Sequence, residues 1–275
     1  MAPWVGTLIG DTGLRVDPRG DIFFTSSRLC TKHGARTIWS SAMELELRDT
    51  LREADVPVIH QVHGAFEDLI RGAARGRYFR EKSKRTRGGI IPDLRWRAED
   101  GEFVLGDVKT IGFGKTRYWG RSPASARAVD TRAASVHTDM RSKLRSIDRS
   151  ILGRSPNGPL ELRLSAVGPI RGLVFGAFGE ISEEARTLLC YAADATAART
   201  WVADGATSEE HAAALLKNRL YRRWGIKTAR EYARIKIDGL RLVGGNPDFT
   251  NAPGHGDDDA RFYDRQQAYV HARGG

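Results

Sequence analysis

Two acidic residues and a lysine stand where they could act together on one substrate. Asp93 follows Pro92, and Asp107, Val108 and Lys109 form a short run further along the chain. Residues i and i+2 of a β-strand point to the same face, so Asp107 and Lys109 share one side if this run is a strand. Carboxylate oxygens are hard ligands suited to Mg²⁺ or Mn²⁺, and a neighbouring lysine can hold an attacking water or stabilise charge on a phosphate. Together these residue types could support metal-dependent hydrolysis of a phosphodiester bond.

Residues 89–111 are predicted to form a β-hairpin that brings the two aspartates together. The link is Glu99-Asp100-Gly101, and a three-residue hairpin loop commonly ends in a residue with positive φ, which Gly101 tolerates. With that loop, Asp93 lies directly opposite Asp107. The same register collects mostly apolar residues on the other face, as expected of a face that packs on a core: Pro92, Leu94, Trp96, Val104, Gly106 and Val108.

Two carboxylates opposed across a hairpin repel each other. The repulsion costs up to about 1 kcal/mol when the pair is exposed and more when it is desolvated. A fold that keeps such a pair usually needs it, most often to bind a divalent cation. The plainer interpretation is that both acids are exposed on the strands and are neutralised by Arg95, Arg97 and Lys109.

This arrangement resembles the PD-(D/E)XK nuclease superfamily, whose fold is called restriction-endonuclease-like. Its members carry an acid after a proline, then a second acid, any residue and a lysine on the next strand, and Pro92, Asp93, Asp107 and Lys109 match those positions. The resemblance implies an α/β fold with a mixed central sheet flanked by helices, in the order helix, about three strands, helix, strand. It covers residues 58–178, under half of the chain, and needs a short strand near 115–119.

The resemblance also implies roles for individual residues. Asp93 and Asp107 would bind Mg²⁺ or Mn²⁺ with the carbonyl oxygen of Val108 as a further ligand, and Lys109 would orient the water or stabilise the pentacoordinate phosphate. The superfamily often adds a glutamate from a helix before the hairpin. Glu67 is the strongest candidate for this third carboxylate, as a metal ligand or general base, because it flanks the apolar stripe of a helix expected over about 59–74. Weaker candidates are Glu44, Glu46 and Asp68.

The charge balance favours a polyanionic partner. The chain has 275 residues with 44 Lys and Arg against 34 Asp and Glu, a formal net charge of +10, so nucleic acid or an acidic membrane surface is expected. The most basic run, residues 75–87, is interleaved with Tyr78 and Phe79 and leads into the hairpin. We interpret it as a phosphate-binding loop, the alternative being an ordinary solvated loop. The candidate nucleic-acid-binding residues are Arg75, Arg77, Arg80, Lys82, Lys84, Arg85, Arg87 and, on a later helix, Arg141.

Other features narrow the location of the protein. The chain has no stretch of 18 apolar residues and no recognisable signal peptide, and its two cysteines fit a reducing compartment. We therefore expect an intracellular protein, cytoplasmic or nuclear, without a membrane partner. His60 and His63 could bind a metal, but surface positions on a helix are the simpler interpretation.

The function expected from these residues is that of a metal-dependent endonuclease, with DNA the favoured substrate. Two alternatives remain: a non-catalytic nucleic-acid-binding module, and a subunit of a larger nucleic-acid-processing complex. Many enzymes of this superfamily cleave as dimers, so a homodimer is a further assembly to consider.

Four segments organise the chain. Residues 1–57 would hold N-terminal strands and a helix that could belong to the core, 58–180 the nuclease core, 181–243 a helical C-terminal region, and 244–275 an extended tail. Within these segments the periodicity predicts further elements: strands in the first 25 residues, helices over about 40–53 and from 131 for about twenty residues, strands at 160–167 and 171–178, and two helices after Ser182.

Overall fold

A computed structural model describes residues 5–9, 13–17, 22–25, 35–83, 89–112, 124–154 and 156–241. The chain divides into two units, Met1–Gly20 with Ile237–Gly275, and Asp21–Lys236. In the first unit, an antiparallel bridge joins Leu8 to Arg15. The strands expected in the first 25 residues are limited to that bridge within the described segments, and Ile22–Thr25 forms a short helix, α1, in place of a strand.

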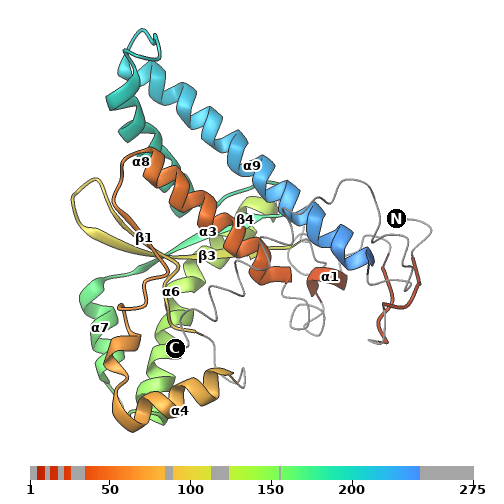
Figure 1. Ribbon diagram of the computed structural model, residues 1–275, viewed down its shortest axis with the longest axis vertical. Coiled ribbons are helices and arrows are strands. Elements are labelled where there is room, and N and C mark those ends of the chain that lie inside the picture. Colours follow the sequence, from red (N-terminus) through yellow and green to blue (C-terminus); the bar gives the residue numbers. More distant parts are fainter. Residues whose placement is uncertain are drawn as a thin grey trace, which may run out of the picture. The chain divides into compact units, whose positions relative to one another are not determined.

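The second unit is built on a four-stranded mixed sheet (Figure 1). Its strands follow the order β1 (Val58–His60), β2 (Leu94–Arg97), β3 (Phe103–Ile111) and β4 (Ile170–Gly176). The β1–β2 and β2–β3 pairs are antiparallel, whereas β3 and β4 run parallel. The α/β class expected from the sequence is therefore confirmed.

The hairpin has the predicted register. Leu94 pairs with Gly106 and Trp96 pairs with Val104. Gly101 ends the loop with φ of 84°, and its N–H donates to the carbonyl oxygen of Ala98 at 3.0 Å. The hairpin 89–111 was thus predicted correctly from its turn residues and its apolar pattern.

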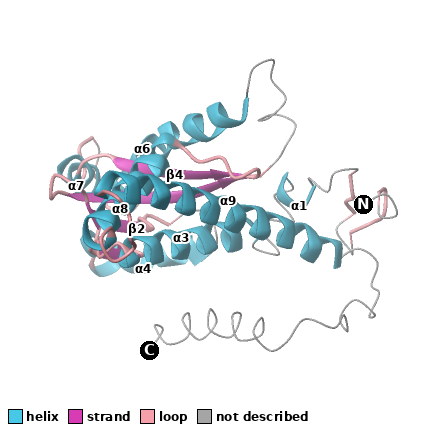
Figure 2. Cartoon of the chain, turned by 90° about the horizontal axis from the view of Figure 1, so that it is seen from above, coloured by secondary structure: helices cyan, strands magenta, loops and turns pink. Residues whose placement is uncertain are grey.

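Helices cover both faces of the sheet. In Figure 2, α6 lies on one side of β4 while α3 and α9 lie on the other. On the α6 side, a β-carbon added to Gly172 of β4 would lie 2.6 Å from the backbone of Ala133, so strand and helix pack very closely. On the opposite side, the rings of Phe175 and Trp224 meet edge to face at 5.8 Å. The helices are α3 (Ala35–Glu53), α4 (Gly72–Ser83), α6 (Ala124–Ser150), α7 (Pro159–Val167), α8 (Glu183–Thr200) and α9 (Glu209–Arg241), with a 3₁₀ turn, η3 (Glu67–Leu69).

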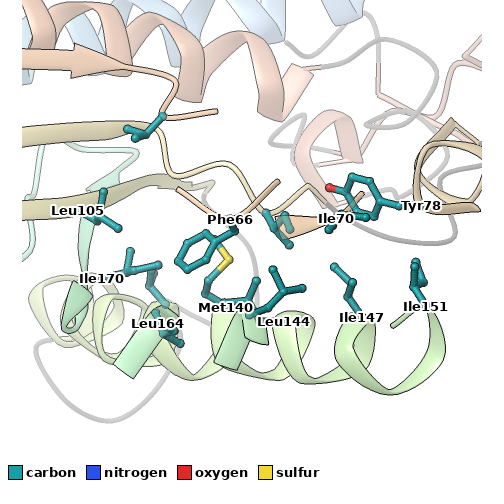
Figure 3. Packing of buried hydrophobic residues seen from close by; sticks show 14 residues of the cluster. Phe66, Ile70, Tyr78, Leu105, Met140, Leu144, Ile147, Ile151, Leu164 and Ile170 are labelled. Carbon is teal, nitrogen blue, oxygen red and sulfur yellow. The ribbon is translucent and has the colours of Figure 1, made fainter. Parts of the chain in front are cut away.

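A large apolar cluster lies between α6 and the segment that precedes the hairpin. Figure 3 shows Leu144 and Ile147 of α6, and Ile151 directly after it, projecting from one side toward Ile70 and Tyr78. Spacings of three and four residues place these α6 side chains on one face, as the sequence predicted. Their burial fixes the helix against the loop and helix that lead to Asp93.

The C-terminal helix α9 is fastened to α3 by polar contacts as well as by packing. The guanidinium group of Arg223 forms ion pairs with Glu46 and Glu53 of α3. The indole N–H of Trp224, which is fully buried, donates to the hydroxyl oxygen of Thr50 at 3.1 Å. These bonds hold the C-terminal half of α3 against α9.

One predicted helix is absent. Residues 59–74 do not form a continuous helix, since β1 occupies Val58–His60 and only the 3₁₀ turn η3 follows before α4 begins at Gly72. The left-handed conformations of Gln61 and Gly72, with φ of 53° and 57°, interrupt any helix there. Apolar spacing alone did not reveal these backbone breaks.

Two other segments expected as strand or loop are helical. Residues 160–167, predicted as a strand, form α7, because Pro159 begins it and the carboxylate of Asp148 accepts hydrogen bonds from the backbone N–H groups of Leu160 and Glu161. Most of the basic run expected to be a loop forms α4.

The remaining helices and the last strand agree with the sequence apart from their ends. Helix α3 begins at Ala35, so Ser40 lies inside it and does not cap it. Ser182 caps α8 as expected, with its hydroxyl oxygen accepting from the N–H of Ala185. The strand expected at 171–178 is β4, whereas the strand expected near 115–119 and the tail 244–275 lie outside the described residues. In the part of the chain that is described, no helix is long and apolar enough to cross a membrane.

The close approach at Gly172 gives a test of the packing. Replacing Gly172 by Ala places a methyl group 2.6 Å from the backbone of Ala133 and should lower the free energy of unfolding by about 1–3 kcal/mol. Gly225 of α9 is the matched control, because a β-carbon there meets nothing within 4 Å. Gly225→Ala should stabilise by about 0.5–1 kcal/mol through its better helix propensity. Urea denaturation measures both, and equal stability of the two variants would contradict the packing.

Candidate active site

The hairpin brings together Asp93, which lies just before β2, and Asp107, which lies within β3. The backbone N–H of Val108 donates to the Oδ2 atom of Asp93 at 2.6 Å, so the Asp93 side chain reaches across to the strand that carries Asp107. On its other side, the carbonyl oxygen of Asp93 accepts from the N–H of Gln61 at 2.7 Å. A side-chain hydrogen bond to β3 and a backbone hydrogen bond to Gln61 therefore hold Asp93 just before β2.

Lys109 lies with the two carboxylates, as the strand alternation predicts. Its Nζ atom forms an ion pair with Asp107 and lies 4.0 Å from Oδ2 of Asp93. The same ammonium group donates to the carbonyl oxygen of Val108 at 3.1 Å. Asp93, Asp107, Val108 and Lys109 thus form one cluster.

The two arginines that could have neutralised the acids are engaged elsewhere. Arg95 stacks over the ring of Phe103 at 4.0 Å, and Nε of Arg97 donates to the carbonyl oxygen of Gly101. Asp107 is only 7 % exposed. Of the plainer interpretation, neutralisation by Lys109 agrees with this geometry, whereas exposure of Asp107 and pairing with Arg95 and Arg97 do not.

Burial of like charges dominates the electrostatics of the cluster. The pKa of Asp93 is raised from its ordinary value of 3.8 to about 8, first by burial and then by the negative charges of Asp107 and Glu44. Lys109 and the N–H of Val108 act in the opposite direction but do not restore the ordinary value. One ammonium group therefore leaves the carboxylates short of positive charge.

The third carboxylate near Asp93 is Glu44, from helix α3. Glu44 is 6 % exposed, and its charge contributes to the raised pKa of Asp93. Nε2 of His60, on β1, lies 3.3 Å from Oε2 of Glu44. Glu44 was a weaker candidate in the sequence and His60 was assigned to a helix surface. A helix expected over 59–74 makes Glu67 the candidate from the helix before the hairpin. Because β1 and η3 lie there instead, the helix before the strands is α3, which carries Glu44.

Glu67, the preferred candidate from the sequence, is engaged by a different group of residues. Its Oε1 atom accepts from the hydroxyl of Tyr78 at 2.9 Å and from Nζ of Lys82 at 3.0 Å. It is not among the charges that shift the pKa of Asp93. The 3₁₀ turn η3 directs Glu67 toward α4, where it holds that helix.

The predicted nucleic-acid-binding residues are only partly described. Arg75, Arg77, Arg80 and Lys82 lie on α4, whereas Lys84, Arg85 and Arg87 fall outside the described residues. Nε of Arg141 pairs with the buried carboxylate of Glu161 at 3.0 Å, although half of its side chain remains exposed.

The donor set suits a hard divalent cation. Asp93, Asp107 and Glu44 supply carboxylate oxygens, and the negative charges of Asp107 and Glu44 add to burial in raising the pKa of Asp93. Among the described residues, no three His, Cys, Asp or Glu side chains already stand together as a metal-binding group. Binding would therefore require the carboxylates to adjust, with Lys109 giving up part of its contact with Asp107.

Comparisons with known proteins identify no relative. No protein-family model matches the chain, and neither the curated proteins nor the solved structures contain a match.

The raised pKa of Asp93 predicts how stability changes with pH. Between 3.8 and about 8 the folded protein holds a proton on Asp93 that the unfolded chain has released, so the free energy of unfolding falls as pH rises through this window. Asp93→Asn, whose amide oxygen can still accept from Val108, should lose this decline and exceed the wild type near pH 8 by at least about 1 kcal/mol, or about 2–4 °C in Tm.

Thermal melts from about pH 5 to about pH 8 measure the effect. Asp68→Asn is the control, because the Asp68 side chain is 39 % exposed and should leave the wild-type slope intact. A parallel decline in wild type and Asp93→Asn would show that Asp93 titrates normally.

Proposed function

We propose that this protein is a metal-dependent nuclease that hydrolyses phosphodiester bonds, with DNA the favoured substrate. The observation that carries the proposal is the pair of carboxylates Asp93 and Asp107 beside the ammonium group of Lys109, with the charge of Glu44 also acting on Asp93. Retained repulsion of this kind is typical of sites that bind a cation and is unusual in a purely structural position.

The order of elements supports the same proposal. Apart from η3 and α4, which lie between β1 and β2, and α7, which lies between α6 and β4, the elements run in the order helix α3, strands β1, β2 and β3, helix α6 and strand β4. This is the order expected from the resemblance to the PD-(D/E)XK superfamily. With α3 as the first helix, the core extends over residues 35–176 and Glu44 comes from the helix before the three strands, the place where the superfamily often has a glutamate.

Each residue of the cluster has a role that follows from its chemistry. Asp93, Asp107 and Glu44 would hold Mg²⁺ or Mn²⁺, with the carbonyl of Val108 as a further oxygen donor. When bound, the cation would lower the pKa of a water molecule and offset charge on the phosphate. Lys109 would stabilise the additional negative charge of the pentacoordinate phosphate. His60 would orient Glu44 through their contact at 3.3 Å.

Cleavage of nucleic acid tests the proposal. Supercoiled plasmid and single-stranded DNA are incubated with the protein in Mg²⁺, Mn²⁺ or EDTA. Wild type should cleave only with metal, and Asp107→Ala and Lys109→Ala should each lower the rate by at least about 100-fold, because each removes a group that acts on the transition state. Salt-sensitive binding without cleavage would instead indicate a non-catalytic nucleic-acid-binding module. Cleavage that survives in both variants would place the active site elsewhere.

The third carboxylate can be tested by a matched pair of variants. Glu44→Gln should lower cleavage by at least about tenfold, because it removes one of the three carboxylates proposed to hold the cation. Glu67→Gln changes a glutamate that contacts Tyr78 and Lys82, and should cleave at close to the wild-type rate. Single-turnover rates at saturating metal measure both. A larger loss of cleavage in Glu67→Gln than in Glu44→Gln would instead make Glu67 the third carboxylate of the site.

A further inference from the structure

The helix that precedes the hairpin carries an exposed aromatic ring among positive charges. Phe79 of α4 is 41 % exposed. Its ring lies 5.6 Å from the guanidinium carbon of Arg75 and 5.8 Å from Nζ of Lys82. Both distances are near the outer limit of about 6 Å for a cation–π contact, so the cations border the ring without stacking closely on it.

The ring is held by its surroundings. Tyr78 is fully buried in the apolar cluster, and its ring meets Phe79 edge to face with centroids 5.3 Å apart. Lys82 is positioned by its hydrogen bond to Glu67, which also accepts from Tyr78. Phe79 is therefore an exposed apolar surface with a fixed support beneath it.

Phe79 and the two cations beside it lie close to Asp93 and Asp107. Cε of Lys82 is 3.8 Å from the position of a β-carbon on Gly89. Asp93 is four residue steps from Gly89 along the chain, a length that spans at most about 14 Å. A strand of nucleic acid bound at Asp93 and Asp107 needs only a few nucleotides to reach Phe79.

We propose that Phe79, bordered by Arg75 and Lys82, is a stacking platform for an unpaired nucleobase, and that the substrate is single-stranded nucleic acid or a single-stranded segment beside a duplex. The inference takes nucleic acid as the substrate and so rests on the proposed function. A phenyl ring offers its face to any base, while neighbouring cations bind the phosphates. Bases inside a continuous duplex are stacked on each other and cannot present a face to the ring.

Fluorescence anisotropy with the full chain in EDTA tests this inference without cleavage. The probes are labelled oligothymidylate and oligouridylate of about 15 nucleotides, matched to the site sizes of single-strand binders, and a duplex of the same length at one salt concentration. Phe79→Ala should weaken single-strand binding at least about fivefold, the smallest loss expected for one base–ring stack, and leave duplex binding unchanged. Phe79→Trp should restore it. The two single strands distinguish DNA from RNA.

Phe103 provides the matched control. It is an exposed phenylalanine, 48 % accessible, with Arg95 over its ring, but it lies on the hairpin and not on α4. Phe103→Ala should bind like wild type, and circular dichroism should show all variants folded. Equal losses in Phe79→Ala and Phe103→Ala, or no loss in Phe79→Ala, would overturn the platform while leaving the nuclease proposal standing. Failure of wild type to bind any of the probes would overturn both.

Discussion

The opposition of Asp93 and Asp107 inside a covered sheet is the constraint on which the site depends. Water would screen two such charges, but Asp107 is almost fully buried and the pKa of Asp93 rises to about 8. Among the described residues, the N–H of Val108 and the ammonium group of Lys109 compensate these charges. At neutral pH the cluster therefore favours either a proton or an additional cation, and this preference links the stability of the fold to its chemistry.

The surrounding elements pack closely around the sheet and bring a third carboxylate near Asp93. A β-carbon on Gly106 would lie 2.7 Å from the Trp96 ring, and one on Gly172 would strike α6, so the sheet around Asp107 has little spare room. Helix α3 brings Glu44 to Asp93, and α9 holds α3 through the Arg223 ion pairs. The C-terminal helix therefore supports the site without contributing a residue to it.

The sequence was informative where local chemistry decides the structure. Gly101 and the alternating apolar residues specified the hairpin register, and the α6 stripe appeared as expected. The first strand was missed because it has three residues and depends on pairing with β2, which no local pattern reports. Helix α7 was missed because its start depends on Asp148, which lies on another helix. Missing this strand also decided between Glu67 and Glu44. With a helix expected over 59–74, Glu67 lay on the helix before the strands, whereas in the structure that helix is α3 and carries Glu44.

Binding of Mn²⁺ tests the central claim most directly, because it requires no knowledge of the natural substrate. The free-ion electron paramagnetic resonance signal reports how much Mn²⁺ remains unbound as the protein is titrated. The account predicts saturable binding in wild type and in Glu67→Gln, and its loss in Asp107→Asn. Equal binding by wild type and Asp107→Asn, or no saturable binding by wild type, would contradict a cation site at these carboxylates.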